Sequence, residues 1–224
     1  MSVGEVQLAR SRVTKELRRI GLMPVTDSVV PSLVSIITGA PISGSWWGHP
    51  AGHLIYGVSE ALESDPDVLV LRLWRGKLTF VHRRLWPALT RVGTARTSWQ
   101  MSGLSAVARQ LLIRVDRERT LRSDHLPPDF TEDSQGFRPA LRDLELRLLV
   151  LTRSVHTSTG AHALEAESWK AWGARARTAR FTGTVESAQL ALEKAATRLA
   201  SEEHPSRSFP WGRTPSRSGR ARRR

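Results

Sequence analysis

The segment SGSWWGHPAGH, residues 43–53, places two histidines and two tryptophans among three glycines. His49 and His53 stand four residues apart, a spacing at which two imidazoles on one helix can share a metal ion. His82 is the nearest further histidine in chain order that could complete such a site. The pair lacks the glutamate of the H-E-x-x-H pattern. We therefore expect no metal site and no cofactor here.

Other catalytic signatures are missing from the sequence. It contains no G-x-S-x-G, no Walker A loop and no dinucleotide-binding G-x-G-x-x-G. The absence of cysteine excludes disulfides, thiolate metal sites and cysteine nucleophiles. Ser45 lies close to His49, but a catalytic triad also needs an acid that orients the imidazole. His49, His53 and His82 are thus candidate catalytic residues for a reaction that the sequence does not name.

The same segment predicts local structure. Gly44 and Gly48 permit an unusual backbone, His49 is the expected helix cap, and Pro50 suits the first position of a helix. That helix has apolar residues along one face, at Leu54, Ile55, Val58 and Leu62. Its free N–H groups beside indoles and imidazoles also suit an anion. The segment is therefore first a helix entrance, and second a candidate anion pocket.

The charge of the chain points to nucleic acid. The formal net charge is +13, and the last 19 residues hold seven arginines and no acid. Because Ser, Pro, Gly and Arg bury little apolar surface, we expect a disordered tail over residues 204–224. Arg222 and Arg223 would then contact phosphates without reading sequence. The alternative is a tail that only keeps the protein soluble.

The sequence also bears on location. No apolar run approaches the roughly 18 residues that span a bilayer, and the first 21 residues lack the apolar stretch of a secretory signal. We therefore expect a cytoplasmic protein without membrane contact.

Residues 1–95 predict one helical unit that ends in a hairpin. Apolar residues recur at helical spacing over 6–20, 26–39 and 50–62, with glycines after the first two stretches. The period then changes to two over 67–74 and 77–82, and only Arg75 and Gly76 separate these runs, which indicates a tight turn. A short helical pattern follows at 83–93.

Residues 96–203 predict a second unit with the same order of elements. A clear amphipathic pattern covers 103–118, a short helix is expected over 120–126, and a third helix over 138–150. The runs 150–156 and 161–167 flank the loop TSTG and indicate a hairpin. An apolar stripe over 185–199 predicts a closing helix. We place the boundary between the units within residues 93–103.

The third helix of the second unit is the candidate recognition helix. If its leucines face the core, Arg138 and Arg142 share another face and can reach guanine edges or phosphates in a major groove. Arg153 would act from the hairpin that forms the wing. The alternative is a solvated helix face with Arg–Glu pairs at helical spacing, because Glu145 lies on the same face as the two arginines.

Aromatic and basic residues also alternate in the first unit. Trp47 lies in the quoted segment, and Lys77, Arg83 and Arg84 lie on and after the predicted hairpin. Rings that stack on bases and cations that contact phosphates are typical of nucleic-acid clefts. The alternative is that most of the tryptophans are core anchors.

The second half resembles winged-helix DNA-binding proteins, through LSAVARQLLIRVDRERTLRSDHL and FRPALRDLELRLLVLTRSVHTSTGAHALEAESW. It is more loosely similar to the winged-helix DNA glycosylases of the AlkZ type. That family's catalytic residues include a Gln-x-Gln motif, and no two glutamines here stand two apart. The resemblance thus implies the scaffold and not the glycosylase chemistry. The first-half string GSWWGHPAGHLIY resembles uncharacterised bacterial proteins and implies no function.

We therefore expect a mainly helical α+β protein of two winged-helix-like units with short hairpins and a basic tail. The leading hypothesis is a nucleic-acid-binding protein, with duplex DNA as the favoured partner. The alternatives are a DNA-repair enzyme on a glycosylase-like scaffold and a winged-helix module that binds another protein.

Overall fold

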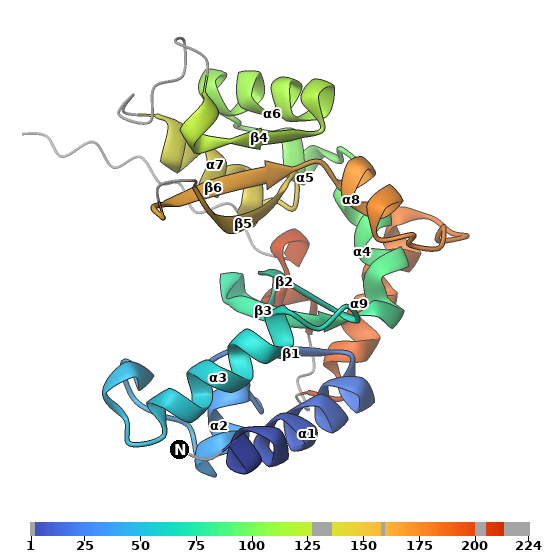
Figure 1. Ribbon diagram of the computed structural model, residues 1–224. Helices are drawn as coiled ribbons and strands as arrows, with labels where there is room; N and C mark the ends of the chain where they lie inside the picture. Colours follow the sequence, from blue (N-terminus) through green and yellow to red (C-terminus); the bar gives the residue numbers. More distant parts are fainter. Residues whose placement is uncertain (1–2, 127–135, 158–159, 200–204, 213–224) are drawn as a thin grey trace, which may run out of the picture.

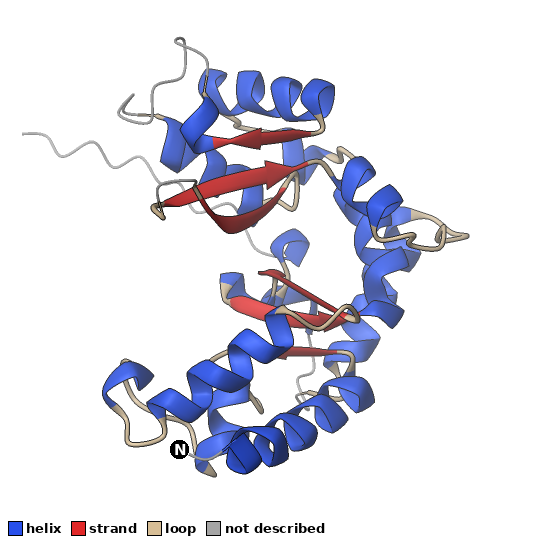
Figure 2. Cartoon of the chain, viewed as in Figure 1, coloured by secondary structure: helices blue, strands red, loops and turns tan. Residues whose placement is uncertain are grey.

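The computed structural model describes residues 3–126, 136–157, 160–199 and 205–212. The protein is α+β, as the sequence predicts, with two three-stranded antiparallel sheets that each pack against helices. Figure 1 shows the two sheets one above the other, with α4, α8 and α9 along one side and an open side opposite. Figure 2 shows that the strands are few and short beside the helices.

The first sheet is built from a hairpin and one short strand. The order is β1-β3-β2. Arg75 and Gly76 both have positive φ, 50° and 69°, so the tight turn lies where the sequence predicts it. The first unit consists of α1 (Val3–Ile20), β1 (Leu22–Pro24), α2 (Leu33–Thr38), α3 (Gly52–Glu63), β2 (Val68–Arg72) and β3 (Leu78–His82).

Both faces of this sheet are buried. Phe80 and Met23 pack with α1, α2 and α3, whereas Val81 and Leu22 face a second core that continues into the rest of the molecule. Successive side chains of a strand point to opposite faces, so β3 contributes to both cores.

The second unit has a similar order of elements, without a counterpart of α2 among its described residues. Its sheet has the order β4-β6-β5, so the strand after the first helix again pairs with the last strand. Residues 120–126, expected as a short helix, instead form a strand and a 3-10 turn, because Thr120–Arg122 pair with Glu167–Glu165. The elements are α6 (Ala106–Glu118), β4 (Thr120–Arg122), α7 (Phe137–Leu146), β5 (Leu151–His156) and β6 (His162–Glu167).

Tryptophans join the two units. Trp86, Trp169 and Trp172 lie edge to face in one core with Leu148 and Leu151 of the second unit. The closing helix packs on α4 of the first unit, although the sequence placed it in the second. The connecting helices are α4 (Trp86–Gly93), α5 (Ser98–Met101), α8 (Trp169–Arg175) and α9 (Val185–Ala196).

Several predicted helix ends shift. α2 begins after Ser32, whose hydroxyl accepts from the Ser35 N–H, and α3 begins at Gly52 instead of Pro50. Trp46–Gly48 form a 3-10 turn that is followed by His49, and Nδ1 of His49 accepts the Ala51 N–H at 3.1 Å. The residue before α3 is Ala51, which makes no side-chain cap, so the expectation that His49 caps this helix is wrong. α7 ends at Leu146, four residues before the predicted end.

Part of the expected tail is ordered. Pro205–Ser208 and Pro210–Gly212 form 3-10 turns, and Phe209 is buried edge to face against Trp74. Phe209 and Trp211, which stack on each other, explain why these residues join the core. Residues 213–224, with Arg222 and Arg223, lie outside the described residues.

Among the helices of the described ranges, none combines the length and the apolar character that crossing a membrane requires.

Candidate nucleic-acid interface

The cations expected to read DNA from the second unit are mostly held in ion pairs. Arg142 Nη1 lies 2.8 Å from Glu145 Oε2, and Arg153 Nε lies 2.7 Å from Glu165 Oε1 across the hairpin. Arg138 lies exposed at the start of α7. Because a paired arginine must exchange its carboxylate for a phosphate, α7 and the wing present less available positive charge than the sequence suggests.

The corresponding helix of the first unit carries no Lys or Arg. α3 exposes His53, Tyr56 and Glu60, and Trp47 lies against it with 66% of its surface exposed. Most other tryptophans are buried or partly buried in the cores, as the alternative interpretation held. Trp47 lines a hollow with Arg72 and Lys77 and also with Glu60 and Glu63, so acids and bases balance around it.

Lys77 has a structural partner. Its Nζ lies 2.9 Å from Oδ2 of Asp27, a buried carboxylate that also accepts the Val29 and Val30 N–H groups. Burial raises the pKa of Asp27, but the hydrogen bonds from Lys77 and from the two backbone groups outweigh it and leave the pKa below its ordinary value. Arg75 also reaches this carboxylate, at 3.4 Å. Lys77 therefore neutralises a buried acid.

His82 lies in a group of cations at the end of β3. Its Nδ1 accepts the Arg84 N–H at 3.4 Å. Burial lowers the pKa of His82, and the positive charges of Arg84 and Arg18 lower it further. Arg83 is paired with Asp67 at 3.1 Å. Burial lowers the pKa of Arg84, and the positive charge of Arg198 lowers it further.

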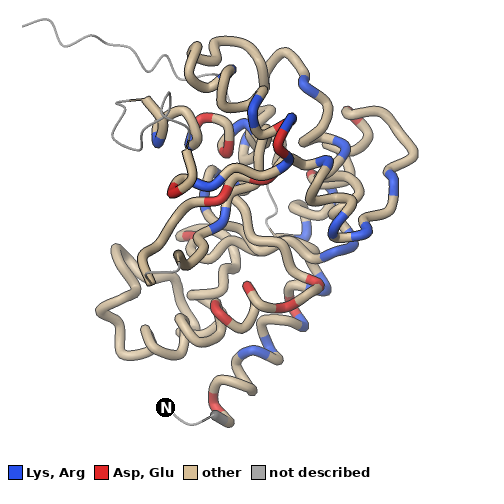
Figure 3. The backbone as a smooth tube through the Cα atoms, turned by 45° about the horizontal axis from the view of Figure 1, so that its top comes forward, with Lys and Arg blue, Asp and Glu red and all other residues tan. Residues whose placement is uncertain are grey.

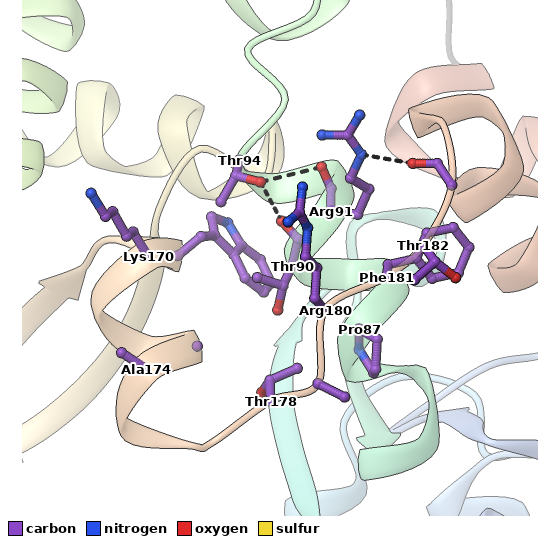
Figure 4. A pocket seen from close by; sticks show the side chains of 14 residues that line it. Pro87, Thr90, Arg91, Thr94, Lys170, Ala174, Thr178, Arg180, Phe181 and Thr182 are labelled. Carbon is purple, nitrogen blue, oxygen red and sulfur yellow. Dashed lines mark hydrogen bonds between the residues drawn. The ribbon is translucent and has the colours of Figure 1, made fainter.

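A second group of cations surrounds a hollow between α4, α8 and the loop that follows α8. This hollow has a volume of about 620 Å³, and Arg91, Lys170 and Arg180 line it, with no Asp or Glu among the described lining residues. Figure 4 shows that these side chains come from three different segments. Arg91 Nε also donates to the Gly183 carbonyl at 3.2 Å, which fixes the loop against α4. Glu186 is an acid near this hollow, and its pKa lies below the ordinary value. The larger causes are hydrogen bonds from its own backbone N–H and from the Thr184 side chain, and the positive charge of Arg91 is a smaller one.

Two hydroxyls in the wall of this hollow are unsatisfied. The Oγ1 atoms of Thr90 and Thr178 are buried and have no hydrogen-bond partner in the described part of the chain. Buried polar groups usually have a partner, so these two hydroxyls are exceptions within the described ranges. The three cations that line the hollow suit a phosphate group.

We call Arg18, Arg84, Arg198, Arg91, Lys170 and Arg180 the basic ridge. No Asp or Glu of the described residues forms an ion pair with any of them. The two groups flank α4, whose eight residues span about 12 Å. Figure 3 shows Lys and Arg gathered along this side of the molecule. Of the ridge, only Arg84 was predicted from the sequence, because its members come from segments far apart in the chain.

The histidines do not form a common site. His49 caps a turn, His53 is exposed on α3, and His82 lies among arginines at the end of β3. No group of three potential metal ligands occurs in the described ranges. Comparisons of the chain with protein-family models, with curated proteins and with solved structures found no match.

Proposed function

We propose that this protein binds nucleic acid, with duplex DNA as the favoured form, through phosphate contacts on the basic ridge. The observation that carries the proposal is that the cations of the ridge lack carboxylate partners, whereas those of α7 and the wing are largely paired. Unpaired cations gain most from a phosphate backbone, because binding releases the counterions of the DNA without breaking an internal pair.

The repeated order of elements supports this proposal. The first unit has a helix, a short strand, two further helices and a hairpin. The second has the same order with one α-helix fewer among its described residues, and each sheet has the same strand order. This is the order of a winged helix, so we propose that both units are winged helices and that α7 is the recognition helix of the second. Arg138, Arg142 and Arg153 would then contribute by exchanging their present partners, which are Glu145 for Arg142 and Glu165 for Arg153, for phosphates.

Charge removal from the ridge tests the proposal. Lys170→Gln with Arg180→Gln removes two exposed cations that make no structural bond in the described residues. Fluorescence anisotropy with a labelled 20-base-pair duplex should show at least tenfold weaker binding than the native chain. The matched control is Arg109→Gln with Arg119→Gln, on and directly after α6, which removes two exposed arginines without an ion pair in the described residues and should change the affinity less than twofold. Equal losses in the two variants would reject the ridge as the binding surface.

A further inference from the structure

An aromatic pocket with surplus acid lies on the first unit. Trp47 stacks on Trp46 with ring centroids 4.3 Å apart, and Tyr56 of α3 lies 5.7 Å from Trp47. Trp47, Tyr56 and Leu78 expose 66%, 48% and 40% of their surface, far more than apolar side chains of a core. They line a hollow of about 520 Å³ together with glutamates of α3. Exposed rings that cluster at a hollow mark an interaction site.

The charges of this pocket favour a cationic occupant. The Glu60 carboxylate has no partner among the described residues, and Glu63 accepts only the Ser59 hydroxyl, at 3.1 Å. The two cations in the lining are occupied, because Lys77 pairs with Asp27 and Arg72 pairs with Glu145. Aromatic faces beside free carboxylates attract Lys or Arg side chains and repel phosphates.

A groove between the two sheets continues from the pocket. This groove, of about 490 Å³, shares Glu63 and Leu78 with the pocket, and strands β2 and β5 line its two sides. Both are edge strands. Its cations are also occupied, since Arg153 pairs with Glu165 and Arg175 with Glu167.

The hydrogen-bond pattern of each hairpin shows which residues of the edge strands β2 and β5 leave their backbone N–H and C=O groups open to another strand. At one end of the β2–β3 hairpin the Arg83 N–H donates to the Asp67 carbonyl, and at the other end the Leu73 N–H donates to the Lys77 carbonyl. Bonded and non-bonded residues alternate along an antiparallel pair, so Leu69 and Leu71 bond to β3. The backbone groups of Val68 and Val70 therefore point away from β3. The Thr157 N–H donates to the Ala161 carbonyl, which by the same alternation turns the backbone groups of Thr152 and Ser154 outward.

We propose that the groove and the pocket together bind an extended peptide segment of a partner protein, which carries Lys or Arg at alternate positions. The segment adds as a strand to an open edge, and its alternate side chains point to one side. One cation reaches Glu60 and the faces of Trp47 and Tyr56. The ridge would then bind nucleic acid while the opposite, acidic side of the first unit binds protein, and neither activity requires the other.

The test uses the full chain and a labelled octapeptide of alternating arginine and valine with blocked ends. Fluorescence anisotropy should show saturable binding, and the same peptide with glutamate in place of arginine should not bind. Trp47→Ala with Glu60→Gln should weaken binding at least tenfold. Ile113→Ala with Glu118→Gln on α6, where Ile113 is as exposed as Trp47 but Glu118 pairs with Arg114 and Arg117, should change it less than twofold. Methylation of alternate backbone nitrogens of the peptide should weaken binding at least fivefold in one of the two registers, because one register bonds to the strand edge.

Several results would overturn the proposal. Unchanged peptide affinity in Trp47→Ala/Glu60→Gln, with native circular dichroism, would remove the pocket from the site. Loss of DNA binding in this variant, or displacement of the peptide by duplex DNA, would make the surface a nucleic-acid site. If the peptide does not bind, and the native chain forms a dimer that Trp47→Ala/Glu60→Gln abolishes, the occupant of the groove is a second copy of this chain. Because the ridge variants Lys170→Gln/Arg180→Gln should keep peptide binding, failure of this proposal and failure of DNA binding are distinguishable.

Discussion

Nε of Arg72 lies 3.4 Å from Oε2 of Glu145, which links the last residue of β2 in the first unit to α7 of the second. The same carboxylate accepts Arg142 Nη1 and the Thr152 hydroxyl, each at 2.8 Å. One glutamate therefore fastens the candidate recognition helix to the neighbouring hairpin and neutralises two arginines. Any DNA that approaches α7 competes with Glu145 for these cations.

Glu145→Gln should raise the affinity for duplex DNA. The change removes a negative charge from α7 and releases Arg142 and Arg72 for phosphates, so we expect threefold to tenfold tighter binding at low salt. The gain should shrink as salt rises, since screening weakens the contacts. Anisotropy with the labelled duplex measures it. Glu118→Gln on α6 is the control, because Glu118 also pairs with two arginines, Arg114 and Arg117. An equal gain there would mean that the position of the released arginines on α7 does not matter.

The stability of the protein should depend on pH through His82. Burial and the nearby Arg84 lower its pKa in the fold from the ordinary 6.5. The unfolded chain therefore takes up the proton first as the pH falls below about 6.5, and stability falls with it. Thermal unfolding at pH 7.5 and 5.5 should show a larger drop in Tm for the native chain than for His82→Gln. Identical drops would contradict the environment described for this imidazole.

If DNA phosphates lie near His82, the affinity for DNA should depend on pH in the opposite direction from the stability of the fold. Because a phosphate stabilises the imidazolium, DNA affinity should rise between pH 7.5 and 6.0 more in the native chain than in His82→Gln. This comparison tests whether the Arg18, Arg84 and Arg198 end of the ridge contacts the DNA.

Gly93→Ala should destabilise the fold. A Cβ at this position would lie 2.4 Å from the Trp169 ring, so α4 and α8 could not keep their close packing. We expect a loss of about 1–3 kcal/mol in the free energy of unfolding, although alanine favours helix over glycine. Urea denaturation measures it. Gly48→Ala is the control, because nothing lies within 4 Å of its added Cβ, and it should be nearly neutral.

The sequence predicts the long elements well and the short strands poorly. The change of period over 67–82, with Arg75 and Gly76 between the runs, defines the first hairpin. Three residues are too few to show a period, so the sequence predicts no strand at β1 and predicts a helix where β4 lies. These strands exist because the last strand of each hairpin offers them a partner edge. That edge is a tertiary feature.

The candidate site was harder to predict for the same reason. Each arginine is visible in the sequence, but its availability depends on whether a carboxylate lies beside it in space. Arg142 and Glu145, three residues apart on a helix, show a pair that local spacing suggests. Arg91, Lys170 and Arg180 come together only through the packing of α4 against α8 and the following loop.

The salt dependence of duplex DNA binding tests the central claim most directly. Each phosphate contact contributes about −0.9 to the slope of log affinity against log salt concentration. With six cations in the basic ridge, we predict a slope of about −5 or steeper for the native chain, and one smaller in magnitude by about 2 for Lys170→Gln/Arg180→Gln. A native affinity that does not fall with salt, or a slope that this variant leaves unchanged, would contradict the basic ridge as the nucleic-acid interface.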